Sequence, residues 1–184
     1  MSLNEIKEIL TKYKTVAVVG LSREPNKDSH RVSAYLKKHG FRIIPVNPFA
    51  DEVLGEKSYK SLLDMPVEVQ ETIDVVDIFR PSKDMPPIVE QALKLKEMYG
   101  KLHVVWMQLG IVNEQAAEVA KKAGLTVVMD KCMMIEHSRF FYIGKQHFSY
   151  AMPPKSNDAI VAMMIMATVS KNVIFQFTRV LFER

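Results

Sequence analysis

The amino-acid sequence predicts an α/β fold, in which five parallel strands form a doubly wound sheet with helices on both faces. Three observations support this prediction. Five short runs are rich in Val and Ile, helical patterns separate them, and the runs are apolar at nearly every position. Such near-continuous apolar character is typical of parallel strands that are buried on both faces. Strands that alternate with helices in this way are joined by right-handed crossovers.

The five apolar runs are the predicted strands, at residues 15–20, 41–46, 73–79, 102–107 and 125–130. A helix over residues 29–39 is followed by Gly40, and a helix from Met85 to about Tyr99 stops at Gly100. Glycine is common after a helix because it readily adopts the left-handed conformation. Asn113 is the expected N-cap of a helix over residues 114–123. The stretch 48–66 is less regular, with a short helix expected near residues 59–63.

Composition and charge narrow the class of partner. The chain has 184 residues, a net charge of +4 and a pI of about 9.1. This mild excess of positive charge favours an anionic ligand. The absence of a dense Lys/Arg run argues against binding to nucleic acid. The single cysteine, Cys132, allows no intramolecular disulfide, and the N-terminus is charged and amphipathic, so we expect a cytoplasmic protein. No metal-ligand cluster or catalytic constellation emerges, which favours binding over catalysis.

We divide the chain into a domain of residues 1–150 and an apolar C-terminal extension of residues 151–184. Residues 159–169 are apolar on all sides, but a helix needs about 20 such residues to span a bilayer. We therefore predict no transmembrane segment. We expect the extension to dock on the domain or on a second subunit, with a membrane-surface anchor or a cloning artefact as the alternatives.

Polar and basic residues follow the first strand, at the edge where doubly wound sheets bind ligands. Gly20 allows a tight turn, Ser22 adds a hydroxyl, and the start of the next helix favours an anion. Arg23, Lys27 and Arg31 surround this turn with positive charge. Taken singly, these features have simpler explanations, because a glycine after a strand often serves only the turn and basic residues at a helix start are commonly solvated.

The second strand ends in Asn47-Pro48, where a nicotinamide-binding protein would carry an acid for the ribose hydroxyl. The missing acid disfavours NAD. An uncharged segment bounded by proline suits the flat face of adenine, and the neighbouring cations suit additional phosphates. An ADP that carries a 3′-phosphate therefore fits this pocket better than NAD does, although Asn47-Pro48 read alone could be a simple turn.

Four stretches together resemble the CoA-binding proteins, small stand-alone relatives of the nucleotide-binding domain in the succinyl-CoA synthetase alpha subunit. They are VAVVGLSREPNKDSHRVSAYLKKHGFRIIPVNP, IDVVDIFRPSKDMPPIVEQAL, VVWMQLGIVNEQAAEVAKKAGLTVVMDKC and MIEH, which occur in that order between residues 16 and 137. Together they are specific, although each alone would not be. The resemblance implies a Rossmann-like fold that holds CoA across the strand ends.

The resemblance also implies which residues contact the ligand. It assigns Gly20, Ser22, Arg23 and Lys27 to the phosphates, Val46, Asn47 and Pro48 to the adenosine, Phe79, Arg80 and Ser82 to the third strand's loop, and Trp106, Gln108 and Gly110 to the pantetheine arm. The charge pattern adds Arg31 to the phosphate region. Cys132, after the fifth strand, is either a small buried side chain or a partner for the CoA thiol, and the second role requires an activated thiolate.

The sequence therefore predicts a protein that binds CoA or an acyl-CoA and has no catalytic centre of its own. Coenzyme A is the expected cofactor. We expect the chain to form a homo-oligomer or to associate with an acyl-CoA enzyme through its extension. Two alternatives stay open. One is a subunit of a nucleotide-dependent acyl-CoA synthetase that works with a separate catalytic chain, and the other is an NAD(P)-responsive redox sensor.

Overall fold

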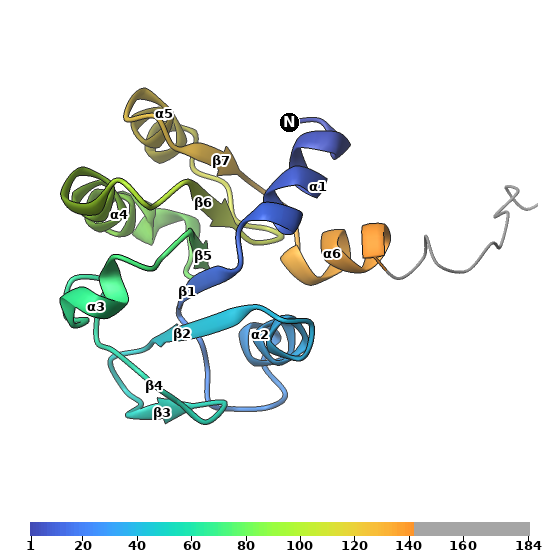
Figure 1. The fold of residues 1–184 in the computed structure, drawn as a ribbon, viewed down its shortest axis with the longest axis vertical. Helices are drawn as coiled ribbons and strands as arrows, with labels where there is room; N and C mark the ends of the chain where they lie inside the picture. The colour runs from blue at the N-terminus through green and yellow to red at the C-terminus, as the bar shows by residue number, and fades with distance from the viewer. Residues whose placement is uncertain (142–184) are drawn as a thin grey trace, which may run out of the picture. The chain divides into compact units, whose positions relative to one another are not determined.

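The computed structural model describes residues 1–141, which form the predicted α/β fold (Figure 1). The five-stranded sheet has the order β2-β1-β5-β6-β7, and each neighbouring pair is parallel. The chain leaves β1 for β2 and returns to β5 on the other side of β1, so the topological switch point lies at β1. The strands are β1 (Thr15–Val19), β2 (Arg42–Val46), β5 (Val75–Ile78), β6 (Val104–Met107) and β7 (Thr126–Val128).

Helices cover both faces of this sheet. The first layer contains α1 (Leu3–Lys12), α2 (Asp28–Lys38) and α6 (Met133–Phe141). The second layer contains α3 (Val67–Gln70), α4 (Met85–Tyr99) and α5 (Glu114–Lys122). Within β1, Val16 and Val18 pack in the first layer, whereas Ala17 and Val19 pack in the second. The strands are apolar throughout because both of their faces are buried.

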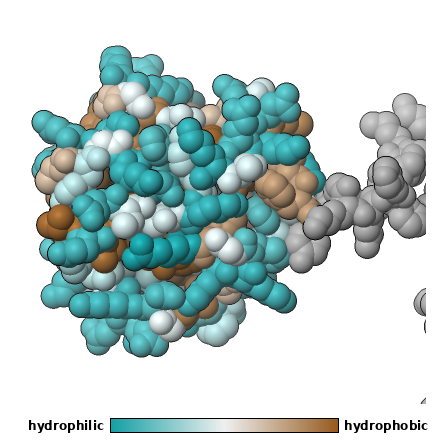
Figure 2. Space-filling view, viewed as in Figure 1, coloured by the Kyte–Doolittle hydropathy of each residue, from teal (hydrophilic) through white to brown (hydrophobic). Residues whose placement is uncertain are grey.

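The helix ends follow the predicted caps. Asn113 Oδ1 accepts a hydrogen bond from Ala116 N at 2.9 Å at the start of α5, and Gly100 ends α4 with a φ of 68°. The amphipathic N-terminal segment forms α1, where Ser2 and Glu5 make a reciprocal capping box. Within residues 1–141, no helix is long and apolar enough to cross a membrane. Figure 2 shows mainly hydrophilic side chains on the visible face of this part of the chain.

The stretch after β2 corrects the prediction of a helix near residues 59–63. The chain instead forms a hairpin from β3 (Glu52–Val53) and β4 (Glu56–Lys57). Tyr59 then runs beside β2, where its N donates to Pro45 O at 3.1 Å and its O accepts from Asn47 N at 2.8 Å. The helix prediction was wrong because this long-range backbone pairing overrides the local helical preference.

The C-terminal boundary of the domain, placed at residue 150, and the extension of residues 151–184 lie outside the described residues. The docking of that extension therefore stays a prediction. The last described element is α6, which was quoted in part as a family-like motif but not predicted as a helix. It packs against α1 and α2.

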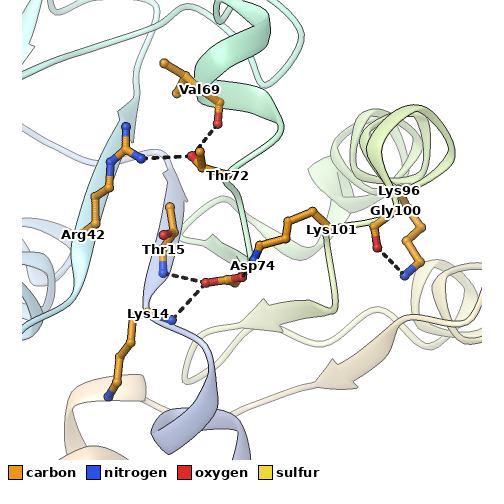
Figure 3. Close-up of polar contacts among 9 residues, drawn as sticks. All are labelled: Lys14, Thr15, Arg42, Val69, Thr72, Asp74, Lys96, Gly100 and Lys101. Carbon is orange, nitrogen blue, oxygen red and sulfur yellow. Dashed lines mark hydrogen bonds and ion pairs between the residues drawn. The ribbon is translucent and has the colours of Figure 1, made fainter.

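Direct polar contacts hold the N-terminal edge of the sheet (Figure 3). Asp74, which precedes β5, is 9% exposed and accepts hydrogen bonds from Lys14 N at 3.1 Å and Thr15 N at 3.0 Å. Lys101 Nζ lies 3.5 Å from the other oxygen of the same carboxylate. These contacts join the starts of β1 and β5 to the segment that leads into β6. This edge therefore serves stability.

Candidate functional site

A cavity of about 540 Å³ opens at the C-terminal ends of β1 and β2. Its walls come from the loops after β1, β2 and β5, from the segment after the β3–β4 hairpin, and from α4. The lining residues are Val19, Gly20, Ser22, Val46, Asn47, Pro48, Phe49, Lys60, Ser61, Leu62, Arg80, Asp84, Pro87, Ile88 and Gln91. Six of the residues predicted from the sequence meet here, namely Gly20, Ser22, Val46, Asn47, Pro48 and Arg80.

Gly20 is required by its backbone conformation and by the close approach of Phe79 and Arg80. Its φ is +87°, and its N donates to Val46 O at 2.9 Å. A Cβ at this position would lie 3.0 Å from Arg80 Cδ and 3.1 Å from Phe79 O. The missing side chain therefore allows the aliphatic part of Arg80 to cross the end of β1.

The turn between β1 and α2 uses most of the polar atoms of Ser22. Its N donates to Ser29 Oγ at 3.0 Å, and its Oγ accepts from Glu24 N at 3.1 Å. Its carbonyl oxygen lies 2.9 Å from His30 Nδ1, so that nitrogen is the donor in this contact. The Ser22 hydroxyl keeps its own O–H donor at the cavity wall.

Asn47 joins the two loops that border the cavity. Its Nδ2 donates to Leu21 O at 2.9 Å, and its Oδ1 accepts from Phe49 N at 2.9 Å. An aspartate could not donate to the Leu21 carbonyl and would place a negative charge against it. The missing acid at this position thus has a local structural reason in addition to any effect on ligand choice.

The positive charge of the cavity comes from Arg80 and Lys60. Arg80 Nη2 pairs with Asp84 Oδ2 at 3.1 Å, and both side chains line the cavity. Lys60 was not among the residues predicted from the sequence, and it lies on the segment that Tyr59 holds beside β2. No periodic pattern marks Lys60 as a site residue.

The three basic residues predicted around the β1–α2 turn lie outside the cavity lining. Arg23, Lys27 and Arg31 are all exposed. Lys27 Nζ lies 4.0 Å from Glu24, and Arg31 pairs with Asp28 on the first turn of α2. The structure therefore does not bring these three cations together with Arg80.

One face of α4 and its preceding turn form the cavity wall opposite β1. Asp84, Ile88 and Gln91 follow one another at helical spacing along this face. Gln91 Oε1 accepts from Leu62 N at 3.1 Å, which fixes the orientation of the amide and leaves Nε2 as the donor. The spacing from Asp84 to Gln91 shows that these residues share one face of α4, but only the packing of α4 places that face at the cavity.

The other predicted contacts lie outside the cavity, along the edge formed by β5, β6 and β7. Gln108 Nε2 donates to both carboxylate oxygens of Asp77, at 2.9 and 3.0 Å. Asp77 is fully buried, and this burial raises its pKa to about 7, with the hydrogen bond from Gln108 opposing the shift. Trp106 is also fully buried and donates from Nε1 to Lys131 O at 2.7 Å.

Ser82 and Gly110 support the loops at this edge. Ser82 Oγ accepts from Val112 N at 3.1 Å, and Gly110 N donates to Asp130 Oδ1 at 2.7 Å. Phe79 is half-buried and packs against the core of the first layer. Gln108, Trp106, Ser82 and Gly110 thus have structural partners within residues 1–141.

Cys132 is half-buried beside the first helical layer. Burial raises the pKa of its thiol, and this effect outweighs hydrogen bonds from the backbone of Ile135 and Met134, which lower the pKa. A raised pKa disfavours the thiolate, which is the form that reacts with disulfides. The surroundings of Cys132 favour the role of a small packed side chain over that of an activated thiol.

Comparison with known proteins places the chain among proteins that carry a CoA binding domain. The family model described as "CoA binding domain" matches residues 14–138. The uncharacterized protein YneT of Bacillus subtilis (strain 168) is 43% identical over 134 residues, which cover 73% of this chain and 93% of YneT.

Longer enzymes contain a similar region. The acetate–CoA ligase [ADP-forming] of Methanocaldococcus jannaschii is 28% identical over 153 residues, covering 81% of this chain and 21% of the ligase. The alpha subunit of acetate–CoA ligase [ADP-forming] II of Pyrococcus furiosus is 32% identical over 65% of this chain and 27% of that subunit. The chain therefore spans about a quarter of these ligase chains.

Two solved structures share the fold of this chain. A protein from Pyrococcus horikoshii OT3 has a TM-score of 0.68 and 43% identity, with coverage of 76% of this chain and 92% of that chain. A protein from Thermus thermophilus has a TM-score of 0.68 and 36% identity, with coverage of 77% and 100%.

Proposed function

We propose that this chain, which belongs to the CoA binding domain family, binds coenzyme A or an acyl-CoA and has no catalytic centre of its own. The observation that supports this proposal is the cavity at the switch point, where Arg80 and Lys60 lie beside an uncharged rim. A volume of about 540 Å³ is within the usual range for small-molecule sites.

The chemistry of the walls suits the two ends of such a ligand. Arg80 and Lys60 would hold phosphate groups, because guanidinium and ammonium groups form charge-assisted hydrogen bonds with phosphate oxygens. The apolar surfaces of Val46, Pro48 and Phe49 would face the base. Phe49 is 82% exposed at the rim, and an aromatic ring there could stack on adenine.

The proposal keeps the six predicted residues that line the cavity as ligand contacts. A contact from Arg23, Lys27, Arg31, Phe79, Ser82, Gln108, Gly110 or Cys132 stays a prediction. A cytoplasmic setting likewise stays part of the proposal, as does association with an acyl-CoA enzyme through the extension.

The relatives favour a second candidate function, that of a subunit of an acyl-CoA synthetase. Two relatives are named acetate–CoA ligases, and this chain matches only 21% and 27% of their lengths. A separate chain would then supply the rest of the reaction. Co-purification of a larger ATP-binding chain under native conditions would support this function, and isolation of the protein with CoA alone would favour the main proposal.

Calorimetry of the full chain with CoA, adenosine and NADH tests the main proposal. We expect CoA to bind and Arg80→Ala to weaken it about tenfold or more, because a charge-assisted contact contributes about 1.5–3 kcal/mol. The affinity for adenosine should fall much less in the same variant. Arg42→Ala is the matched control, since it removes an exposed basic side chain at the start of β2, outside the cavity lining. Binding of NADH at concentrations where CoA gives no heat would favour the NAD(P) sensor instead.

A further inference from the structure

The lining of the cavity contains a negatively charged side chain, which opposes its positive charge. Among residues 1–141, the charged side chains that line the cavity are Lys60, Arg80 and Asp84. The Asp84 side chain is 30% exposed, and its Oδ2 accepts from Arg80 Nη2 at 3.1 Å. Asp84 holds the position before α4 where an aspartate commonly caps the helix, yet its side chain makes no capping hydrogen bond. Its carboxylate is directed to Arg80 instead.

The positions of both Arg80 and Asp84 are fixed by their surroundings. The aliphatic part of Arg80 passes over Gly20, where a Cβ would lie 3.0 Å from Arg80 Cδ. Asp84 is part of the 3₁₀ turn Ser82–Asp84, whose backbone is closed by the hydrogen bond from Asp84 N to Pro81 O at 2.8 Å. The contact uses one nitrogen of Arg80, although a guanidinium has five N–H donors. Arg80 can therefore accept a new anion, but only beside an existing negative charge.

We propose that Asp84 is a specificity-determining residue, which competes with ligand anions for Arg80 and so restricts the cavity to ligands that carry several phosphate charges. This inference rests on the proposed function for the identity of the natural ligand. A ligand with one carboxylate would offer Arg80 only a negatively charged hydrogen-bond acceptor, which Asp84 already provides. A ligand with several phosphates adds contacts to Lys60 as well, and these offset the competition.

The experiment compares wild type, Asp84→Asn and Glu90→Gln by calorimetry with CoA, pyrophosphate and adenosine. Glu90 is the matched control, because it lies on α4, pairs with Lys94 Nζ at 2.9 Å with the same i,i+4 spacing and lies outside this cavity lining. Each substitution removes one negative charge. Thermal unfolding checks that all three proteins are folded.

We expect Asp84→Asn to tighten CoA and pyrophosphate binding about fivefold, which corresponds to about 1 kcal/mol for a partly exposed ion pair. Adenosine should bind unchanged, and Glu90→Gln should alter no ligand by more than about twofold. Equal gains in both variants would mean a general charge effect and overturn the proposal. Weaker phosphate binding in Asp84→Asn would also overturn it.

Failure of this inference and failure of the proposed function give different results. If pyrophosphate binds more tightly to Asp84→Asn while CoA gives no heat with any variant, the role of Asp84 stands and CoA is not the ligand. If CoA binds wild type and Asp84→Asn equally, CoA binding stands and the role of Asp84 falls. If neither phosphate compound binds any variant, both fall.

Discussion

A carboxylate with a basic neighbour lies at each end of the sheet strands, but the two pairs have different surroundings. At the N-terminal edge, the Asp74 carboxylate accepts two backbone N–H groups and lies 3.5 Å from Lys101 Nζ (Figure 3). At the C-terminal edge, Arg80 makes one contact with Asp84, and the cavity is also lined by Lys60 and Gln91. Groups of the chain itself satisfy the Asp74 carboxylate, whereas the contact with Asp84 uses one nitrogen of a guanidinium that has five N–H donors.

The difference between these two pairs indicates which part of the fold is available for binding. Both edges contain a carboxylate near a basic residue, so charge alone does not distinguish them. The difference is that Asp74 is buried against backbone, whereas Arg80 and Asp84 lie at the wall of a cavity. Changes at the N-terminal edge should therefore affect stability first, and changes around the cavity should affect binding first.

The largest expected effect is on the N-terminal edge. Asp74→Ala should lower the free energy of unfolding by about 3 kcal/mol, because it leaves two backbone N–H groups without their acceptor. Urea unfolding measures this loss. Asp74→Asn keeps one acceptor oxygen and should lose about half as much. CoA affinity of the folded variants should not change, and a selective loss of affinity would break the comparison.

A second carboxylate, Asp77 inside β5, should make stability depend on pH. Burial raises its pKa in the folded protein to about 7 from the ordinary 3.8, so the folded state keeps a proton that the unfolded state loses. The free energy of unfolding therefore falls as pH rises through this window and is level above it, with a loss of about 2 kcal/mol between pH 5 and 7.

Asp77→Asn should remove this part of the pH dependence. Unfolding of wild type and variant at pH 5, 6, 7 and 8 measures the difference in slope. Parallel curves for the two proteins would show that Asp77 does not keep its proton when folded.

Gly20→Ala tests the close approach at the cavity. The substitution should cost about 1–2 kcal/mol of stability, because a positive φ and a clash with Arg80 Cδ and Phe79 O act together. Gly124→Ala is the control, with a φ of +79° and no atom within 4 Å of the added Cβ. CoA affinity should fall only in Gly20→Ala. Equal effects in the two variants would remove the argument for Arg80 crossing the strand end.

The smallest expected effect comes from Asn47→Asp. The substitution should cost about 1 kcal/mol of stability, since the donor to Leu21 O is replaced by a carboxylate. It should also weaken CoA binding, because it adds a negative charge at the rim of the cavity. Asn26→Asp adds the same charge on the exposed part of the β1–α2 turn. Thermal unfolding and calorimetry measure both effects, and a stability loss in Asn26→Asp as large as that in Asn47→Asp would contradict the local explanation.

The predicted elements were close to the observed ones wherever the pattern was local. The five strands, the Asn113 cap and the glycine ends of α4 and α5 depend on residues near in sequence, and the structure confirms them. Among the predicted site residues, those directly at the ends of β1 and β2 line the cavity. Gln108 and Trp106, which were predicted to border the ligand, lie outside the cavity lining, and their side chains are hydrogen-bonded inside the fold.

The missed cavity residues share a cause. Lys60 is carried to the cavity by the hairpin and by the pairing of Tyr59 with β2, which is a long-range contact. Asp84 and Gln91 are brought in by the packing of α4, and a helix pattern does not show which neighbour each face meets. Arg31 shows the converse, since it is near the turn in sequence but pairs with Asp28 outside the cavity.

The sequence by itself determined the order along the chain of the five sheet strands and of helices α2, α4 and α5, and the burial of the strands on both faces. These features follow from apolar periodicity and from residues with special backbone preferences, which act over a few positions. Only the tertiary structure decided which charged side chains share a cavity and that Asp84 opposes Arg80 there. That outcome depends on contacts between segments far apart in the chain, where no local pattern records the partner.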